Sequence, residues 1–335
     1  MTRAALLACC VIVTAAYAQR APPVAIEQLA AQSQRQRENT LAEIRFSDGG
    51  DEVLLALETE AAIRADARRE EGRPPLFPGC LRADEFELAA QLALARASLD
   101  AKAYRVLAVE YRRLTTALRL ALADSQASGR WRPRFAHVGH WIDDWEHAGV
   151  DVTRELLRRT LLDQAIRASL SQFAGARIYG KSRAAVALRV YDEYVFNLMC
   201  TADEDNLSWL KQQLETIGWF DIGKYGWAAD QAASLMVQHA DGDPQYQAYI
   251  AAALEPRVAS GDTNPQNFAV LSDRVAVRAG RPQRYATQVE CVNGEWLAPK
   301  IEEPESLDAR RARVGLPPYL EQLADTRLVC GRRHR

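Results

Sequence analysis

The sequence lacks several features that define common classes of protein. Its 42 basic and 44 acidic residues almost balance, with a formal net charge of −2, which argues against a nucleic-acid or membrane-surface role. No Cys-x-x-Cys spacing occurs, so a structural zinc site is not indicated. No Gly-x-Ser-x-Gly motif and no obvious cysteine nucleophile occur, so covalent catalysis has no clear candidate. Beyond residue 18, no stretch approaches the roughly 20 apolar residues that span a bilayer.

The first 18 residues have the three parts of a secretory signal peptide. A single cation, Arg3, precedes an uncharged apolar stretch over residues 4–15, and a small-x-small sequence ends at Ala18. We therefore expect cleavage after Ala18 and export of the mature chain, to the periplasm or the medium. A lipid-modified Cys9 is a second interpretation, which the short apolar lead before that residue disfavours.

Two cysteines leave with the signal peptide, and export explains the others. The mature chain retains Cys80, Cys200, Cys291 and Cys330. Four thiols in an oxidising compartment predict two disulfides, with three pairings open. We favour Cys80 with Cys200 and Cys291 with Cys330.

The rest of the chain divides into a helical N-terminal region, residues 19–150, and a second domain, residues 151–330. In the first region the sequence predicts two helices within 24–70, interrupted near Gly49, and a helical hairpin over 84–124. In the second, helices are predicted over 153–173, 184–199, 206–217 and 227–240. Asp243 before Pro244 predicts the start of a further helix, which runs to about Ala259.

The pattern changes period after this helix. Residues 274–278, 284–290 and 295–301 alternate or carry strand-forming residues, and Asn293-Gly294 is typical of a hairpin turn. These features predict a three-stranded antiparallel meander, followed by a helix that stops at Gly315. The expected fold class is therefore mainly α with a small antiparallel β-meander, an α+β domain behind a helical N-terminal half.

One stretch, GARIYGKS at 175–182, matches the phosphate-binding loop pattern letter by letter. That loop must leave a buried strand and enter a helix, so that backbone amides face the phosphates. The preceding residues have a helical period instead, and an exported protein meets few nucleoside triphosphates. A glycine-bounded loop between helices is the better interpretation.

A connector rich in tryptophan and histidine raises a second alternative. Its polar members at helical spacing are His137, His140, Asp144 and His147. On one continuous helix they would share a face and suit metal binding. Pro133 and Gly139 argue against such a helix, so packing or surface histidines are favoured over ligands.

The stretch LMVQHADGDPQYQ, residues 235–247, carries the main candidate site. His239 shares the inward face of a predicted helix and lies in its last turn, with Asp241 and Asp243 close behind. A histidine beside carboxylates is a plausible general acid or base. The alternative is that these residues only shape the turn, and a lesser variant is a divalent ion held by all three.

A polar row in the predicted second strand strengthens this candidate. Gln283, Tyr285 and Thr287 alternate onto one face, with Gln288 on the other, and Asp273-Arg274 stands where the chain enters the sheet. A strand needing only a core would carry Val or Ile at such positions. Convergent polar groups beside a helix end indicate a site.

From about Leu161 to Leu323 the chain resembles a bacterial family known only as a domain of unknown function. The segments that carry this resemblance are Asp163-Gln164-Ala165-Ile166-Arg167, Gly218-Trp219-Phe220, Gln238-His239-Ala240-Asp241, Asp273-Arg274, Gly280 to Gln288, and Arg310-Arg311-Ala312-Arg313-Val314-Gly315-Leu316. Two positions depart from the family pattern. Phe220 replaces a proline, and Ala286 replaces a glycine, which implies a positive φ or a close backbone approach at that position. The resemblance implies a shared site and no established activity.

Two functional hypotheses follow. The first is an exported hydrolase or group-transfer enzyme without a cofactor or metal, whose catalytic residues are His239, Asp241, Asp273 and Tyr285. The residues predicted to hold an anionic substrate are Asp163, Gln164, Arg167, Arg274, Gln283, Thr287, Gln288 and Arg311. The second is a non-catalytic binding or interaction protein, in which the same side chains form a structural network and the ligand is a small anion or a protein.

Overall fold

A computed structural model describes residues 26–47, 49–57, 59–60, 80–149, 151–171, 185–292, 295–297 and 299–323. The predicted signal peptide, the GARIYGKS segment and Cys330 lie outside these ranges. The chain divides into two compact units. The first contains residues 1–75, 79–130 and 167–198, and the second contains residues 76–78, 131–166 and 199–335.

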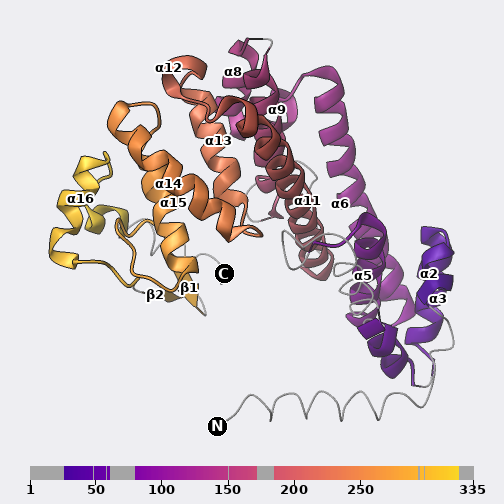
Figure 1. Cartoon of the computed structure of the whole chain (residues 1–335). Coiled ribbons are helices and arrows are strands. Elements are labelled where there is room, and N and C mark those ends of the chain that lie inside the picture. Colours follow the sequence, from indigo (N-terminus) through magenta and orange to yellow (C-terminus); the bar gives the residue numbers. More distant parts are fainter. Residues whose placement is uncertain are drawn as a thin grey trace, which may run out of the picture. The chain divides into compact units, whose positions relative to one another are not determined.

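The first unit is helical throughout its described part (Figure 1). Its helices are α2 (Ile26–Ala31), α3 (Gln34–Arg45), α5 (Ala83–Arg96), α6 (Ala101–Ser128) and the beginning of α11 (Ala185–Ile217). Asp100 caps α6 by accepting from Ala103 N, and Gly129 ends that helix in the left-handed conformation. Leu41, Leu92 and other fully buried side chains form its core, so the helical hairpin predicted over 84–124 is confirmed as α5 and α6.

The second unit contains the remaining helices and a short hairpin (Figure 1). Its elements are α7 (Arg132–Phe135), η1 (Ala136–Val138), α8 (Gly139–His147), α9 (Val152–Arg167), the end of α11, α12 (Ile222–Tyr225), α13 (Trp227–His239), α14 (Pro244–Ser260), α15 (Pro265–Arg278), β1 (Glu290–Val292), β2 (Glu295–Leu297), η3 (Pro304–Ser306) and α16 (Leu307–Arg313). α15 packs against both α13 and α14. Asp243 and Asn264 cap α14 and α15, each followed by proline in the first turn, so the predicted start of α14 is confirmed.

The predicted three-stranded meander is wrong. Residues 274–278 are the last turns of α15, and residues 284–289 form an irregular loop, tied to the chain downstream by an isolated bridge between Gln283 and Ile301. β1 and β2 form a short antiparallel pair on either side of residues 293–294. The alternating sequence at 274–278 is too short to resist helix formation, because the Asn264 cap and buried Phe268 and Leu271 already define a helical face. The described part of the chain is therefore mainly α.

Two helix boundaries also differ from prediction. The segments 184–199 and 206–217 are one helix, α11, and α9 ends at Arg167 rather than near 173. A disulfide joins Cys80 to Cys200, as predicted. The pairing of Cys291 with Cys330 stays a prediction, because Cys330 is outside the described residues. Within the described ranges, no helix combines the length and apolar character needed to cross a membrane.

Candidate functional site

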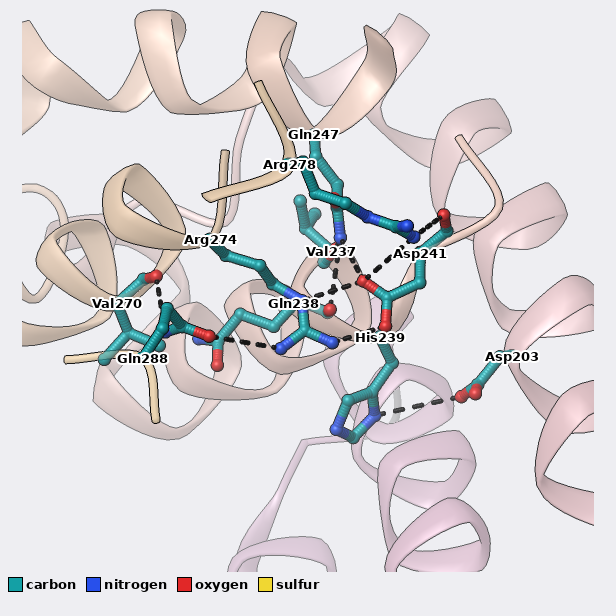
Figure 2. A network of polar contacts seen from close by, with 10 residues as sticks. All are labelled: Asp203, Val237, Gln238, His239, Asp241, Gln247, Val270, Arg274, Arg278 and Gln288. Carbon is teal, nitrogen blue, oxygen red and sulfur yellow. Dashed lines mark hydrogen bonds and ion pairs between the residues drawn. The ribbon is translucent and has the colours of Figure 1, made fainter. Parts of the chain in front are cut away.

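Three helices of the second unit bring a histidine and two carboxylates together. His239 ends α13, and its Nδ1 lies 3.2 Å from Asp163 Oδ2 on α9 and 3.8 Å from Asp203 Oδ1 on α11. The side chains are 19%, 3% and 10% exposed respectively. Figure 2 shows the ring of His239 directed toward Asp203. We call Asp163, Asp203 and His239 the histidine cluster.

The partners of His239 differ from those that the sequence suggested. Asp163 was expected to bind substrate and Asp241 to orient the ring, whereas Asp163 is the carboxylate beside Nδ1. Gln164, also expected at the site, donates from Nε2 to Asp163 Oδ2 at 2.9 Å. Arg167 is the last residue of α9 and belongs to the other compact unit.

Sequence reasoning missed Asp203. It falls in TADEDN, an acidic run that was placed between two predicted helices and therefore assigned no inward face. On the continuous helix α11, Leu207 and Leu210 follow at four and seven residues and are fully buried. Residues at that spacing share a face, so a helix drawn through the acidic run would have identified Asp203 as an inward carboxylate.

Asp241 pairs with arginine rather than with His239. Arg274 donates from Nε to Asp241 Oδ1 at 2.8 Å and from Nη2 to Oδ2, while Arg278 bonds the Asp241 carbonyl (Figure 2). Burial opposes ionisation of this carboxyl, but the hydrogen bonds and charge of Arg274, with the charge of Arg278, outweigh it and hold its pKa below the ordinary value.

Asp243 serves as a helix cap. Its Oδ1 accepts from Tyr246 N at 2.9 Å, and its Oδ2 accepts from Lys211 Nζ at 2.6 Å. Among the described residues, the group of histidine, cysteine or acidic side chains that converges closely enough for one ion is the histidine cluster. The geometry therefore does not support an ion held by His239, Asp241 and Asp243.

Asp273 organises the loop that follows α15. Its carboxylate is fully buried and accepts from the backbone amides of Arg284, Tyr285 and Thr287 and from Thr287 Oγ1, at 2.7 to 3.0 Å. Such a carboxylate replaces the ladder that a strand would have supplied to these amides. The carboxylate of Asp273 thus has its hydrogen-bond partners within this loop, and one of them is the hydroxyl of Thr287.

The polar row expected on a strand closes this loop instead. Gln283 donates from Nε2 to the Gln288 carbonyl at 3.1 Å and accepts at Oε1 from Gln288 N at 2.9 Å. Arg311, fully buried on α16, donates from Nη1 to the Tyr285 carbonyl at 2.6 Å. Tyr285 is 5% exposed. Burial raises the pKa of its phenol, the charges of Asp273 and Glu255 raise it further, and the charges of Arg284 and Arg310 only partly oppose them.

Ala286 occupies the left-handed region, with φ of +53°. This positive φ is one of the two alternatives that the resemblance implied here, and a residue with a Cβ is strained in this region whereas glycine is not. Asp273 accepts from the backbone amides of Tyr285 and Thr287, and Arg311 donates to the Tyr285 carbonyl, so the residues on both sides of Ala286 are held in place.

A cleft of about 520 Å³ lies beside Arg274. Its lining residues are Asp241, Arg274, Val277, Arg278, Gly280, Arg281, Gln283, Gln288, Val289, Pro299 and Lys300. Four of these are cationic, and the single carboxylate, Asp241, is already paired with Arg274. Arg281 and Lys300 are exposed and have no ion-pair partner among the described residues. We call this the basic cleft.

The predicted site therefore separates into distinct parts. Among the described residues, no hydrogen bond or ion pair joins His239 to Tyr285 or Asp273. Tyr285, Thr287 and Arg311 shape the loop, Arg274 and Gln288 line the basic cleft, and His239 faces buried carboxylates.

The tryptophan-rich connector is packed. Trp131 and Trp141 are buried, and His140 stacks at a tilt on Trp141 with ring centroids 4.9 Å apart. His147 Nδ1 lies 2.6 Å from the Asp143 carbonyl. Within the described residues, the connector's histidines and Asp144 do not form a group of converging metal ligands.

These features define a mainly helical domain with a semi-buried histidine cluster and a basic cleft. Residues 150–329, more than half of the chain, match the family of unknown function DUF6624, so the chain belongs to that family. The resemblance found in the sequence is thus confirmed. No curated protein and no solved structure matches the chain.

Proposed function

We propose that the family domain is exported and binds a small anionic molecule in the basic cleft. The observation that carries this is the charge of the lining: four cationic side chains and two amides surround a space with one carboxylate, which Arg274 already neutralises. A cleft lined by one sign of charge attracts the opposite sign. The Cys80–Cys200 disulfide fits an oxidising compartment and supports the exported part of the proposal.

The cleft is also pre-ordered for binding. Arg274 and Arg278 stand four residues apart on one face of α15, and both contact Asp241. Arg274 Nη1 donates to Gln288 Oε1 at 3.5 Å. The backbone amide of Gln288 donates to Gln283 Oε1, which holds Gln288 in position. Guanidinium groups held in this way suit the paired oxygens of a carboxylate or phosphate, and fixed side chains lose little entropy on binding.

In this proposal the saturated residues are a scaffold. Asp273, Thr287 and Arg311 hold the loop that carries Gln283 and Gln288, without touching the ligand. The structural-network hypothesis from the sequence thus describes the support of the cleft, while Arg281 and Lys300 supply its free charge.

Calorimetric titration tests this proposal. Mature chain freed of metal by a chelator, which is then removed by dialysis, is titrated with phosphate, with a dicarboxylate and with a tricarboxylate, at low and high salt. We expect an affinity that falls with salt and that decreases at least roughly tenfold when Arg281→Gln and Lys300→Gln are combined. Lys224→Gln, an exposed lysine on α12 outside the cleft, is the matched control. Equal loss in the control, or no binding of any anion, contradicts the proposal.

A second candidate function is hydrolysis or group transfer centred on His239. It is supported by the ring geometry: Nδ1 faces the buried Asp163, and Nε2 makes no hydrogen bond or ion pair among the described residues. A ring oriented by a carboxylate exposes its second nitrogen for proton transfer. A panel of anionic chromogenic esters and phosphoesters tests this candidate. Turnover lost in His239→Gln and kept in His147→Gln favours an enzyme, whereas anion binding without turnover favours a binding protein.

A further inference from the structure

The histidine cluster has the composition and spacing of a metal site. Asp163, Asp203 and His239 each offer one ligand atom, and these atoms all lie within 4.8 Å of one another. They come from three different helices, α9, α11 and α13. Ligands on helices are held more rigidly than ligands on loops.

The distances fit one ion with little adjustment. Donor atoms bonded to one cation at about 2.1 Å lie about 3.0 Å apart at right angles and about 3.4 Å apart in a tetrahedron. Here Nδ1 of His239 is 3.2 Å from Asp163 Oδ2 and 3.8 Å from Asp203 Oδ1. The ligand atoms of Asp163 and Asp203 lie within 4.8 Å of each other, so binding one ion requires these carboxylates to rotate toward it.

Burial separates this cluster from an ordinary acidic surface. The Asp163 and Asp203 side chains are 3% and 10% exposed. Asp205, two residues along the same helix, is 71% exposed and pairs with Arg159 at 2.6 Å. The acidic run therefore turns one carboxylate inward onto a histidine and leaves another at the surface.

We propose that Asp163, Asp203 and His239 bind one divalent transition-metal cation. Two carboxylates neutralise its charge, and a neutral imidazole completes the three protein ligands, which leaves further positions for water. Imidazole with carboxylate selects zinc, manganese or iron over magnesium and calcium. Gln164 donates to Asp163 Oδ2 at 2.9 Å, so it orients that carboxylate without binding the metal itself. The inference rests on neither the anion cleft nor turnover at His239.

Calorimetric titration of the mature chain tests the site, with chelator removed and without a polyhistidine tag. We expect one equivalent of Zn²⁺ or Mn²⁺ to bind more tightly than Mg²⁺, and to raise the Tm. Asp203→Asn weakens this binding at least about tenfold. Asp205→Asn, the matched change on the same helix, leaves it unaltered. Circular dichroism checks that each variant is folded. If Asp203→Asn does not fold, His239→Gln replaces it as the test variant.

Two results overturn the inference. One is a folded wild-type chain that binds none of the transition metals in stoichiometric amount. The other is equal binding by Asp203→Asn and Asp205→Asn, which places the metal elsewhere. Because anion binding is measured on metal-free protein, failure of the metal site leaves the basic cleft a separate question.

Discussion

Arg274 binds the carboxylate of Asp241 through two parallel hydrogen bonds. Nε donates to Oδ1 at 2.8 Å, and Nη2 donates to Oδ2. The pair joins the segment after α13 to the middle of α15, two helices that pack against each other. Paired bonds of this kind fix direction as well as distance. Asp241 thus positions the arginine that lines the basic cleft, and the same contact keeps the end of α13, with His239, in register.

Arg274→Gln should lower the stability of the fold at neutral pH and make that stability less sensitive to acid pH. The folded-state pKa of Asp241 lies below its unfolded value, so the pair contributes stability above the unfolded pKa, and this is lost as pH falls through the folded pKa, below about 4. We expect the Tm difference between wild type and Arg274→Gln to be largest near pH 7 and to shrink toward pH 3. Thermal unfolding at both pH values measures it.

Arg313→Gln is the control for this experiment, because Arg313 is an exposed arginine of α16 outside the cleft. Its Tm should follow wild type across the same range. A difference between Arg274→Gln and wild type that stays constant with pH would show that packing of the arginine stem, rather than its charge, stabilises the contact.

Asp273→Asn should be among the most destabilising changes of one atom in this domain. Asparagine keeps one acceptor oxygen and turns an N–H₂ group toward loop donors, while Asp273 accepts from three amides and one hydroxyl. Buried donors left without a partner cost about 1–3 kcal/mol each, so we expect a loss of about 2–4 kcal/mol. Urea denaturation of the mature chain measures it.

Asp308→Asn provides the comparison. Asp308 also accepts a backbone amide, from Tyr319 at 2.8 Å, but it is exposed at the surface. Its substitution should cost well under about 1 kcal/mol. If both variants unfold at the same urea concentration as wild type, the carboxylate of Asp273 is free for another role, including the catalytic one that the sequence suggested.

Ala286→Gly should stabilise the protein, although glycine generally destabilises. Ala286 has a φ of +53°, and the left-handed region costs a residue with a Cβ about 1–2 kcal/mol. Glycine also makes the unfolded chain more flexible, which offsets part of this strain relief. We therefore expect the free energy of unfolding to rise by about 0.5–1 kcal/mol. Ala248→Gly, on the exposed face of α14, should instead lose about 1 kcal/mol. Opposite shifts in the urea midpoint confirm the strain, and matching losses deny it.

The sequence predicted what depends on local chemistry. Asp243 before Pro244 identified the start of α14, and the period of apolar residues identified the helices. Both follow from residues and their near neighbours, so no tertiary information is needed. At position 286 the family resemblance implied either a positive φ or a close backbone approach, and Ala286 has a positive φ.

The sequence could not predict which side chains meet across the fold. His239 was assigned to Asp241, two residues away, whereas its partners come from α9 and α11. Alternation predicts a strand after α15, but the same alternation suits a loop folded around one buried carboxylate, and nothing near Asp273 in the sequence indicates that role. Such pairings are properties of helix packing, which short-range patterns do not encode.

Glu87→Gln should stabilise the first unit near neutral pH and flatten its pH dependence. Burial, with Glu38 adding, raises the pKa of Glu87 against its hydrogen bonds from Tyr111 and Gln91. A raised folded-state pKa contributes stability that is complete below the unfolded pKa and is lost as pH rises through the folded value. Glutamine keeps an acceptor for its neighbours and carries no charge to desolvate.

We therefore expect the Tm of Glu87→Gln to equal or exceed that of wild type at pH 7 and to show no gain near pH 4. Thermal unfolding followed by circular dichroism across this range measures the difference. Glu43→Gln, an exposed change on α3, controls for the loss of one negative charge and should leave the profile unaltered. A lower Tm for Glu87→Gln at pH 7 would mean that the ionised carboxylate is favoured in the fold, because its three hydrogen bonds, from Gln34, Gln91 and Tyr111, then outweigh the cost of burial.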